Sequence, residues 1–210
     1  MHIVIPCKTL LAGKSRLAPH LAAARRRALC EEFLQQTLEL AASVVSPEFI
    51  RVVSGDPDVL AIAKRHGTAG IREPEGGLNC ALDTARDALL NDDARVDALL
   101  VLPIDLPFAT ADALAGARAC AGDVVVGPDD GGTGTNLLLL RANAIRRMPF
   151  CFGPGSYAAH LTAAQARGLT VATYEDRRIA FDIDGASQYT AWQAWHASEG
   201  AGAARGRRAH

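Results

Sequence analysis

The sequence predicts an α/β fold in which helices cover both faces of a mostly parallel central sheet. Short runs rich in Val, Leu and Ile alternate along the chain with longer segments of helical periodicity. Such apolar runs are typical of parallel strands, which helices bury on both sides. The chain has 210 residues, and neither an internal repeat nor a linker is visible in it. We therefore expect one domain with one core.

Apolar runs mark the expected strands, and amphipathic segments between them mark the expected helices. The strands are 2–5, 49–54, 98–104, 123–126, 136–140, 169–173 and 179–183. The helices are roughly 21–43, 57–66, 78–92, 111–121, 156–167 and 186–197. From residue 198 onward the stretch SEGAGAARGRRAH is small, polar and basic. We expect a folded domain over 1–197 and a disordered tail over 198–210.

The composition excludes several classes of protein. Hydrophobic residues make up 49% of the chain and the formal net charge is -1, so a surface for nucleic acid or anionic lipid is not expected. No apolar run reaches the roughly 20 residues of a membrane span, and the N-terminus lacks the features of a signal peptide. The five cysteines show no C-x-x-C spacing and the histidines no H-x-x-x-H pair. We expect a cytoplasmic protein without a zinc site.

Asp105 stands in the stretch LPIDLPF, directly after an apolar run that reads as a strand buried on both faces. An acid in this place either caps the next helix or holds a charged ligand. Thr110 fills the capping role better, because it directly precedes the helical pattern. Ligands of open α/β sheets gather beyond the carboxyl ends of the strands. We therefore predict that Asp105 holds a ligand.

Two further acids, Asp182 and Asp184, belong to the stretch FDIDG. If 179–183 is a strand, residues two apart share one face, and the two carboxylates lie side by side. Like charges in such a pair repel unless a cation or hydrogen-bond donors lie between them. The alternative is two surface acids on an edge strand. A set of oxygen ligands without His or Cys indicates Mg²⁺.

A cationic loop, PCKTLLAGKSRLAP, follows the first expected strand. Its AGKS segment is not a P-loop, because Lys8 stands where that pattern needs Gly, and Pro19 follows too soon for the helix. A flexible loop with Lys14 and Arg16 at a strand end nevertheless suits a triphosphate. The alternative is an ordinary solvated basic loop.

Glycine-rich turns precede two of the expected helices. In EPEGGLNCAL, Gly77 allows close approach of a ligand, and Asn79 with free backbone amides suits the edge of a base. In FGPGS, Ser156 opens a helix, where backbone N–H groups and the helix dipole favour an anion. The alternative for EPEGGLNCAL is a plain glycine turn with an Asn near the helix start. The alternative for FGPGS is a serine that only caps its helix.

Together these motifs resemble the guanylyltransferases of coenzyme F420 biosynthesis, the 2-phospholactate/phosphoenolpyruvate guanylyltransferase group. The resemblance runs from Ile3 to about Tyr189. Its carriers are KSRL (14–17), GLNCAL (77–82), LPIDLP (102–107), GTN (134–136), FGPGS (152–156) and FDID (181–184). LPIDLP alone fits any relative, including molybdenum-cofactor guanylyltransferases, whereas GTN with FGPGS is specific to this group.

The resemblance implies a single Rossmann-like nucleotidyltransferase domain of glycosyltransferase-A type. It implies that GMP moves from GTP to the phosphate of a three-carbon acid while pyrophosphate leaves. The acids implied to hold the metal, which we expect to be Mg²⁺, are Asp105, Asp182 and Asp184. The residues implied to bind the acid are Thr135, Gly153 and Ser156.

On the nucleotide side we expect Lys14, Gly77 and Asn79 to contact GTP, and Lys14 and Arg16 to neutralise the leaving pyrophosphate. A phosphate monoester is ionised at neutral pH, so no catalytic base is required. Cys80 departs from the small residue usual in this group, which leaves phosphoenolpyruvate, 2-phospholactate and 3-phosphoglycerate as candidate acids. A molybdopterin or sugar-1-phosphate nucleotidyltransferase and a GTP-binding module without turnover are the alternative functions. A second copy of the chain and the enzyme that consumes the labile product are candidate partners.

Overall fold

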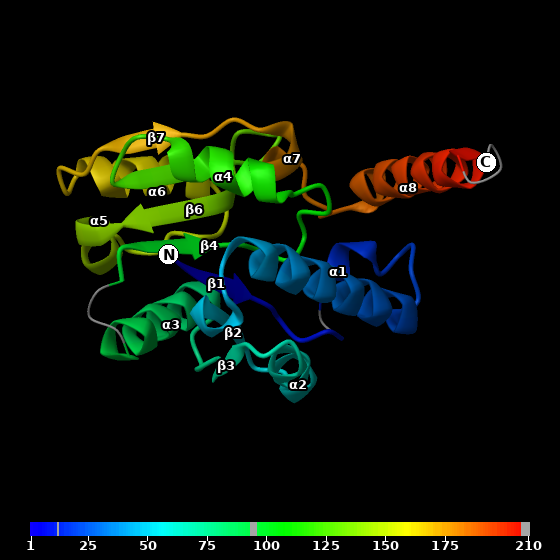
Figure 1. The fold of residues 1–210 in the computed structure, drawn as a ribbon, viewed down its shortest axis with the longest axis horizontal. Helices are drawn as coiled ribbons and strands as arrows, with labels where there is room; N and C mark the ends of the chain where they lie inside the picture. Colours follow the sequence, from blue (N-terminus) through cyan, green and yellow to red (C-terminus); the bar gives the residue numbers. More distant parts are fainter. Residues whose placement is uncertain (12, 93–95, 207–210) are drawn as a thin grey trace.

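A seven-stranded sheet organises the computed structural model, which describes residues 1–11, 13–92 and 96–206 (Figure 1). Its strand order is β3-β2-β1-β4-β6-β5-β7. Neighbours pair in parallel except β6, which runs antiparallel to β4 and to β5. The predicted mostly parallel sheet is therefore confirmed. The strands are β1 (His2–Pro6), β2 (Ile50–Ser54), β3 (Ala69–Arg72), β4 (Ala98–Val101), β5 (Val124–Pro128), β6 (Thr135–Arg141) and β7 (Val171–Thr173).

Helices cover both faces of the sheet, as the alternation of side chains along β1 shows. Ile3 and Ile5 pack in a cluster with apolar residues of α1, α2 and α4, whereas Val4 packs with those of α3, α5 and α6. Residues two apart on a strand share a face, so the two clusters lie on opposite sides of the sheet. The helices are α1 (Ala23–Val44), α2 (Pro57–Arg65), α3 (Leu78–Asp92), α4 (Ala111–Ala119), α5 (Ala142–Arg147), α6 (Ser156–Gln165), α7 (Arg177–Ala180) and α8 (Ala186–Gly206), with short 3-10 turns at Ser15–Leu17 and Pro47–Phe49.

Among the described residues, no helix is both long and apolar enough to cross a membrane.

The prediction of a strand over 179–183 is wrong. The helix α7 occupies the start of this segment, and the residues after it are irregular. The side chain of Asp176 caps α7 by accepting a hydrogen bond from the backbone of Arg178. At the other end, the amide of Asn136 donates to the carbonyls of Ile179 and Ala180, at 3.0 and 2.9 Å. These contacts satisfy backbone groups that a strand would have paired with a neighbour.

The strand β4 ends at Val101, before the predicted end at residue 104, because Pro103 has no N–H to donate to the sheet. The strand β3 and the helix α5 were not predicted. The strand β3 lies at the edge of the sheet and is mostly exposed, so it lacks a buried apolar run. The helix α5 is only one and a half turns long and carries two arginines in its last turn.

The last helix, α8, runs over Ala186–Gly206 and so extends past residue 197, where the predicted disordered tail begins. Residues 207–210 of that predicted tail lie outside the described residues, and the division of the chain at 197 stays a prediction. In Figure 1 the C-terminal part of α8 extends away from the sheet. Its N-terminal part packs on the body through Tyr189 and Trp192, and the Trp192 ring lies 5.3 Å from that of Phe33.

Deleting residues 198–210 is expected to leave turnover and melting temperature nearly unchanged. The buried aromatic residues that attach α8 to the body, Tyr189 and Trp192, precede the deleted segment. Trp192→Ala serves as the contrasting variant, because emptying a buried tryptophan site costs about 3–5 kcal/mol of stability. Melting curves and turnover of the two variants check the prediction. A large loss on deletion would show that the segment docks on the protein or on a second copy.

Candidate active site

A cavity of about 420 Å³ lies at the carboxyl ends of β1 and β4. Its wall includes the loop after β1, with Lys8, Lys14 and Arg16, and the loop after β4, with Asp105. Phe152 from the loop before α6 also lines it. This cavity thus lies at the predicted position of the site, beyond the carboxyl ends of the strands.

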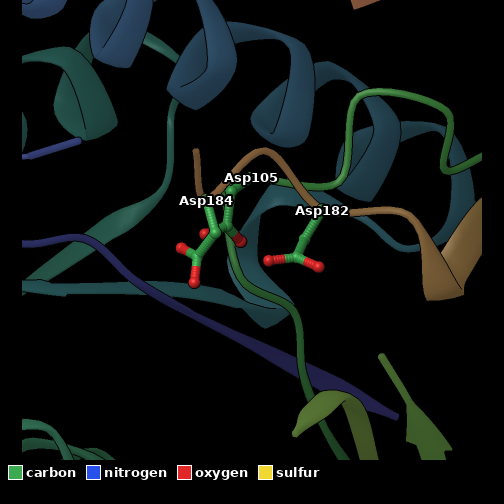
Figure 2. Close-up of side chains that lie close together, drawn as sticks. All are labelled: Asp105, Asp182 and Asp184. Atoms are coloured by element: carbon green, nitrogen blue, oxygen red, sulfur yellow. The ribbon is translucent and has the colours of Figure 1, made fainter. Parts of the chain in front are cut away.

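The three predicted metal-binding acids come together, and two of them, Asp105 and Asp184, line this cavity. Asp105 follows β4, and Asp182 and Asp184 lie between α7 and α8; their side chains reach toward a common space (Figure 2). One carboxylate oxygen of each lies within 4.8 Å of the others. The backbone N–H of Ile183 donates to the carbonyl of Asp105 at 3.0 Å, and the Ile183 side chain is buried among residues of α1 and α8. Backbone pairing and core packing therefore hold the acids together.

Burial and the crowding of like charges both disfavour the charged form of Asp182. Burial, and then the charges of Asp105 and Asp184, raise the pKa of Asp182 to about 6, against a hydrogen bond from Asn136. A cation among the three carboxylates would relieve this repulsion. All the donors are hard oxygen atoms, which suit Mg²⁺ or a similar divalent ion. The residues present therefore fit a divalent metal.

Among the described residues, Lys14 is the more buried of two cations that contact this acidic cluster. Its Nζ lies 3.0 Å from Asp105 Oδ2 and donates to the carbonyl of Ile183 at 2.6 Å. The Lys14 side chain is only 7% exposed, and its backbone has φ +54°. A left-handed conformation at a non-glycine residue costs roughly 1–3 kcal/mol and often marks a functional site. The two contacts offset this strain and hold the ammonium group beside the carboxylates.

Arg16 forms an ion pair with Asp184, with 2.6 Å between Nη1 and Oδ2. Both side chains are more than half exposed, so the pair adds little to stability. The arginine is therefore free to exchange Asp184 for a ligand phosphate. Lys14 and Arg16, the predicted catalytic residues, thus line the cavity together with Asp105 and Asp184.

The predicted acid-binding residues gather at the start of α6. Gly153 and Gly155 have φ of +136° and +71°, values that favour glycine, and Gly155 is the N-cap of α6. Ser156 is the first residue of the helix and is 2% exposed, so the alternative that it serves as the N-cap is wrong. Thr135, the first residue of β6, is held near α6 by a hydrogen bond between its hydroxyl and Nδ1 of His160, at 3.0 Å.

The Asn79 side chain contacts the protein rather than open space. Its Nδ2 donates to the carbonyl of Phe152 at 3.0 Å, and its Oδ1 accepts from the N–H of Phe152 at 2.9 Å. Gly77 has φ +80° and precedes α3, with open space where a Cβ would lie. Contacts of Gly77 and Asn79 with a nucleotide stay predictions, and the structure gives Asn79 a second role in holding the Phe152 loop.

Thr110 caps α4 as predicted, because its hydroxyl accepts from the N–H of Ala113 at 3.2 Å. Asp105 is therefore not required as the helix cap. From the sequence, His160 carried no assignment and Asn136 appeared only within the GTN motif. His160 holds Thr135 in place, and Asn136 holds the segment before Asp182. The only local signal for His160 was its position four residues after Ser156, on the same face of the helix. A polar residue on a face that is otherwise buried indicates a hydrogen-bonding role.

The model of the family described as "Guanylyl transferase CofC like" matches residues 1–192 of the chain. The chain belongs to this family. It is 40% identical over 184 residues to a phosphoenolpyruvate guanylyltransferase of Rubrobacter xylanophilus, with 86% of this chain and 87% of the relative covered. It is 32% identical over 184 residues to a 2-phospho-L-lactate guanylyltransferase of Methanothermobacter thermautotrophicus, with 86% and 78% covered.

Solved structures share the fold of this CofC-like chain. A nucleotidyl transferase from Methanothermobacter superposes with a TM-score of 0.61 at 18% identity, covering 90% of this chain and 94% of that one. A glucosyl-3-phosphoglycerate synthase of Mycobacterium tuberculosis, solved with Mn²⁺, uridine diphosphate and phosphoglyceric acid, superposes with a TM-score of 0.59 at 13% identity, covering 83% and 67%. The predicted nucleotidyltransferase domain is confirmed, and the chain is an enzyme of nucleotidyl transfer.

Proposed function

We propose that this enzyme transfers GMP from GTP to the phosphate of a three-carbon phosphoacid, with release of pyrophosphate, as a step of coenzyme F420 biosynthesis. The observation that carries the proposal is the cluster of three carboxylates, two of which line the cavity, with Lys14 beside it, in a CofC-like chain. The names of the relatives, which specify phosphoenolpyruvate and 2-phospho-L-lactate, support the acceptor class. 3-Phosphoglycerate is the third candidate.

The reaction joins two anions and needs no base. An oxygen of the acceptor phosphate attacks the α-phosphorus of GTP, the new P–O–P bond forms, and the bond from the α-phosphorus to the bridging oxygen breaks, so that pyrophosphate leaves. A phosphate monoester with a second pKa of about 6 is already ionised at neutral pH. Positioning and charge neutralisation therefore supply most of the catalysis.

Each group of the site has a part in this reaction. Lys14 and Arg16 carry positive charge, and both line the cavity and contact the acids. They neutralise charge on the leaving pyrophosphate. Thr135, Gly153 and Ser156 orient the acceptor at the start of α6, where the helix dipole favours an anion. Gly77 and Asn79, which flank the cavity-lining Leu78, are the proposed contacts of the nucleotide.

Asp105, Asp182 and Asp184 are the residues that would hold Mg²⁺. When bound, such an ion supplies positive charge to the phosphates that have to meet. The three side chains fit it because each presents a hard oxygen donor to a common space.

All five cysteines are free thiols, which supports a reducing compartment and hence the cytoplasm as the place of the reaction. A homodimer and an association with the enzyme that consumes the product stay proposals.

A pyrophosphate-release assay with a panel of substrates tests the proposed function. GTP and Mg²⁺ are mixed with phosphoenolpyruvate, 2-phospholactate or 3-phosphoglycerate, and in parallel with a sugar 1-phosphate or molybdopterin; ATP then replaces GTP. We expect release with GTP and one or more phosphoacids, and no release without an acceptor. Faster turnover of a sugar 1-phosphate or molybdopterin, or comparable kcat/KM for ATP, would contradict the proposal. Binding of GTP without any release would indicate a nucleotide-binding module.

Ser156→Ala is expected to raise the KM for the phosphoacid by roughly ten- to a hundredfold, because a hydrogen bond to a charged group contributes about 1.5–3 kcal/mol. The KM for GTP and the melting temperature should change little, since Ser156 is not the N-cap. Ser43→Ala, an exposed serine on α1, is the matched control. Kinetics and melting curves on the same preparations check this. A loss of stability with an unchanged acceptor KM would mean that Ser156 is purely structural.

A further inference from the structure

A buried histidine, His160, links the parts of the proposed acceptor site. It lies on α6, one turn after Ser156, and its side chain is 0% exposed. Its Nδ1 is 3.0 Å from the hydroxyl oxygen of Thr135, and its Nε2 accepts a hydrogen bond of 3.0 Å from the backbone N–H of Cys151. One imidazole ring thus contacts the start of β6 and the loop that leads into α6.

The bond from Cys151 determines which ring nitrogen carries the proton. A nitrogen that accepts an N–H is unprotonated, so a neutral ring has to carry its proton on Nδ1. Burial lowers the pKa of His160 to about 4, although a hydrogen bond with the Ser156 backbone opposes this, so the ring is neutral at pH 7. The Nδ1–H therefore donates toward the hydroxyl oxygen of Thr135, 3.0 Å away, with the Ser156 backbone as a second acceptor.

A hydroxyl that accepts this bond cannot also direct its own hydrogen at the imidazole. The hydrogen of Thr135 is then available to an anion, and an anion offers only acceptors. With the opposite tautomer, Nδ1 would take the hydrogen of Thr135 and the N–H of Cys151 would lose its acceptor. The direction of the Thr135 hydroxyl thus depends on the tautomer of His160.

The loop before α6 is held from a second side as well. Asn79 binds both backbone polar atoms of Phe152, and the Phe152 ring lies 5.0 Å from the His160 ring in an edge contact. The N–H of Tyr157 donates to the carbonyl of Thr133 at 3.1 Å, which joins the start of α6 to the loop before Thr135. Thr135 and the turn at Gly153–Ser156 therefore form one connected unit.

We propose that His160 is a positioning residue of the acceptor site, which holds the Thr135 hydroxyl as a hydrogen-bond donor to the phosphoacid and anchors the turn before Ser156. This inference rests on the proposed function, because it assumes that Thr135 faces the acceptor. His160 itself touches no substrate.

Two substitutions separate its two bonds. The amide of His160→Gln reaches the place of Nε2 and accepts from Cys151, but it loses the donor to Thr135. The amide of His160→Asn reaches the place of Nδ1 and keeps that donor, but it loses the acceptor for Cys151. We expect His160→Gln to keep its melting temperature and to raise the KM for the phosphoacid about tenfold. We expect His160→Asn to lower the melting temperature and to leave the KM for the phosphoacid near the wild-type value, because it keeps the donor to Thr135. If His160→Gln does not fold, the protonation of the imidazole in the wild-type protein decides.

The deciding measurement is a double-mutant cycle with Thr135→Val, in which the hydroxyl is absent. If His160 acts through that hydroxyl, His160→Gln raises the acceptor KM when Thr135 is present. In the Thr135→Val background, His160→Gln changes the acceptor KM by less than about twofold. The KM for GTP should stay constant throughout. Independent effects that multiply would overturn the role of His160. No release of pyrophosphate by the wild-type enzyme with any phosphoacid would instead overturn the proposed function.

Nitrogen NMR of the imidazole provides a readout without turnover. At pH 7 we expect a neutral ring protonated on Nδ1. A ring protonated on Nε2 alone would overturn the inference, because Nδ1 would then accept from the Thr135 hydroxyl, which would not be held as a donor to the acid.

Discussion

Replacing Asp105, Asp182 or Asp184 with Asn is expected to lower turnover by about a hundredfold or more while the fold is kept. Amide and carboxylate have nearly the same size, so packing is preserved. Each change removes one of three oxygen ligands that share a space within 4.8 Å, and with it the negative charge that attracts a divalent cation. Without that cation, the phosphates of GTP and the acceptor repel each other.

The three variants should differ in stability when no metal is present. Burial and like charges raise the pKa of Asp182 to about 6, so its charged form destabilises the fold at pH 7, and this cost vanishes as the pH falls below the unfolded value. Asp182→Asn should therefore raise the melting temperature at pH 7 in EDTA, and the gain should fade toward pH 4. Asp105→Asn should show no such gain, because Asp105 pairs with Lys14.

Turnover against Mg²⁺ concentration, with melting curves beside it, checks these expectations. Raising the Mg²⁺ concentration should partly restore turnover in the variant that keeps the highest affinity for Mg²⁺. Asp87→Asn, an exposed acid on α3, is the matched control and should behave as wild type. Normal turnover in all three variants, or full wild-type activity in excess EDTA, would contradict the metal site.

Lys14→Met is expected to lower kcat/KM for GTP by about 10²–10³-fold, the typical effect of losing one group that stabilises developing charge. The ammonium lies 3.0 Å from Asp105 and 2.6 Å from the carbonyl of Ile183, so its loss also leaves Asp105 without its ion-pair partner. The melting temperature should fall in EDTA and recover in part with Mg²⁺. Lys14→Arg should not restore activity, because a planar guanidinium does not replace a compact ammonium between these two oxygens.

Lys64→Met, an exposed lysine near the end of α2, is the matched control for Lys14. Steady-state kinetics with GTP varied at saturating phosphoacid distinguish a loss at the nucleotide from a loss at the acceptor. Wild-type kcat/KM in Lys14→Met would show that the lysine only balances the acids.

Features with a local signal could be predicted from the sequence. The uncharged run before Asp105 and the prolines around it indicate the end of a buried strand, and the structure has β4 there. Thr110 caps α4 because a threonine directly before an amphipathic segment is a strong helix start. The proximity of Asp182 and Asp184 was predicted from a strand that does not exist. The two acids meet Asp105 because Ile183 is pinned by its backbone bond to Asp105 and by its burial.

Features that depend on distant parts of the chain could not be predicted in this way. Asn79 binds the backbone of Phe152, and Thr135 binds His160, across separations of 73 and 25 residues. No periodicity or turn motif records such pairs. Asn79 was predicted to bind a nucleotide base because the sequence does not show that its amide pairs with the Phe152 backbone. The helix α5 starts at Ala142, whose φ of +34° a non-glycine residue rarely adopts, so its start had no recognisable signal.

Isotope labelling tests most directly whether GMP moves to the acceptor's own phosphate. The phosphoacid selected by the substrate panel is prepared with ¹⁸O in its phosphate and mixed with GTP and Mg²⁺, and the products are followed by ³¹P NMR and mass spectrometry. We predict that all of the label stays in a guanylylated acid with a new P–O–P bond, and that unlabelled pyrophosphate forms in equal amount. Labelled pyrophosphate, or release of GMP or inorganic phosphate in place of pyrophosphate, would contradict guanylyl transfer at this site.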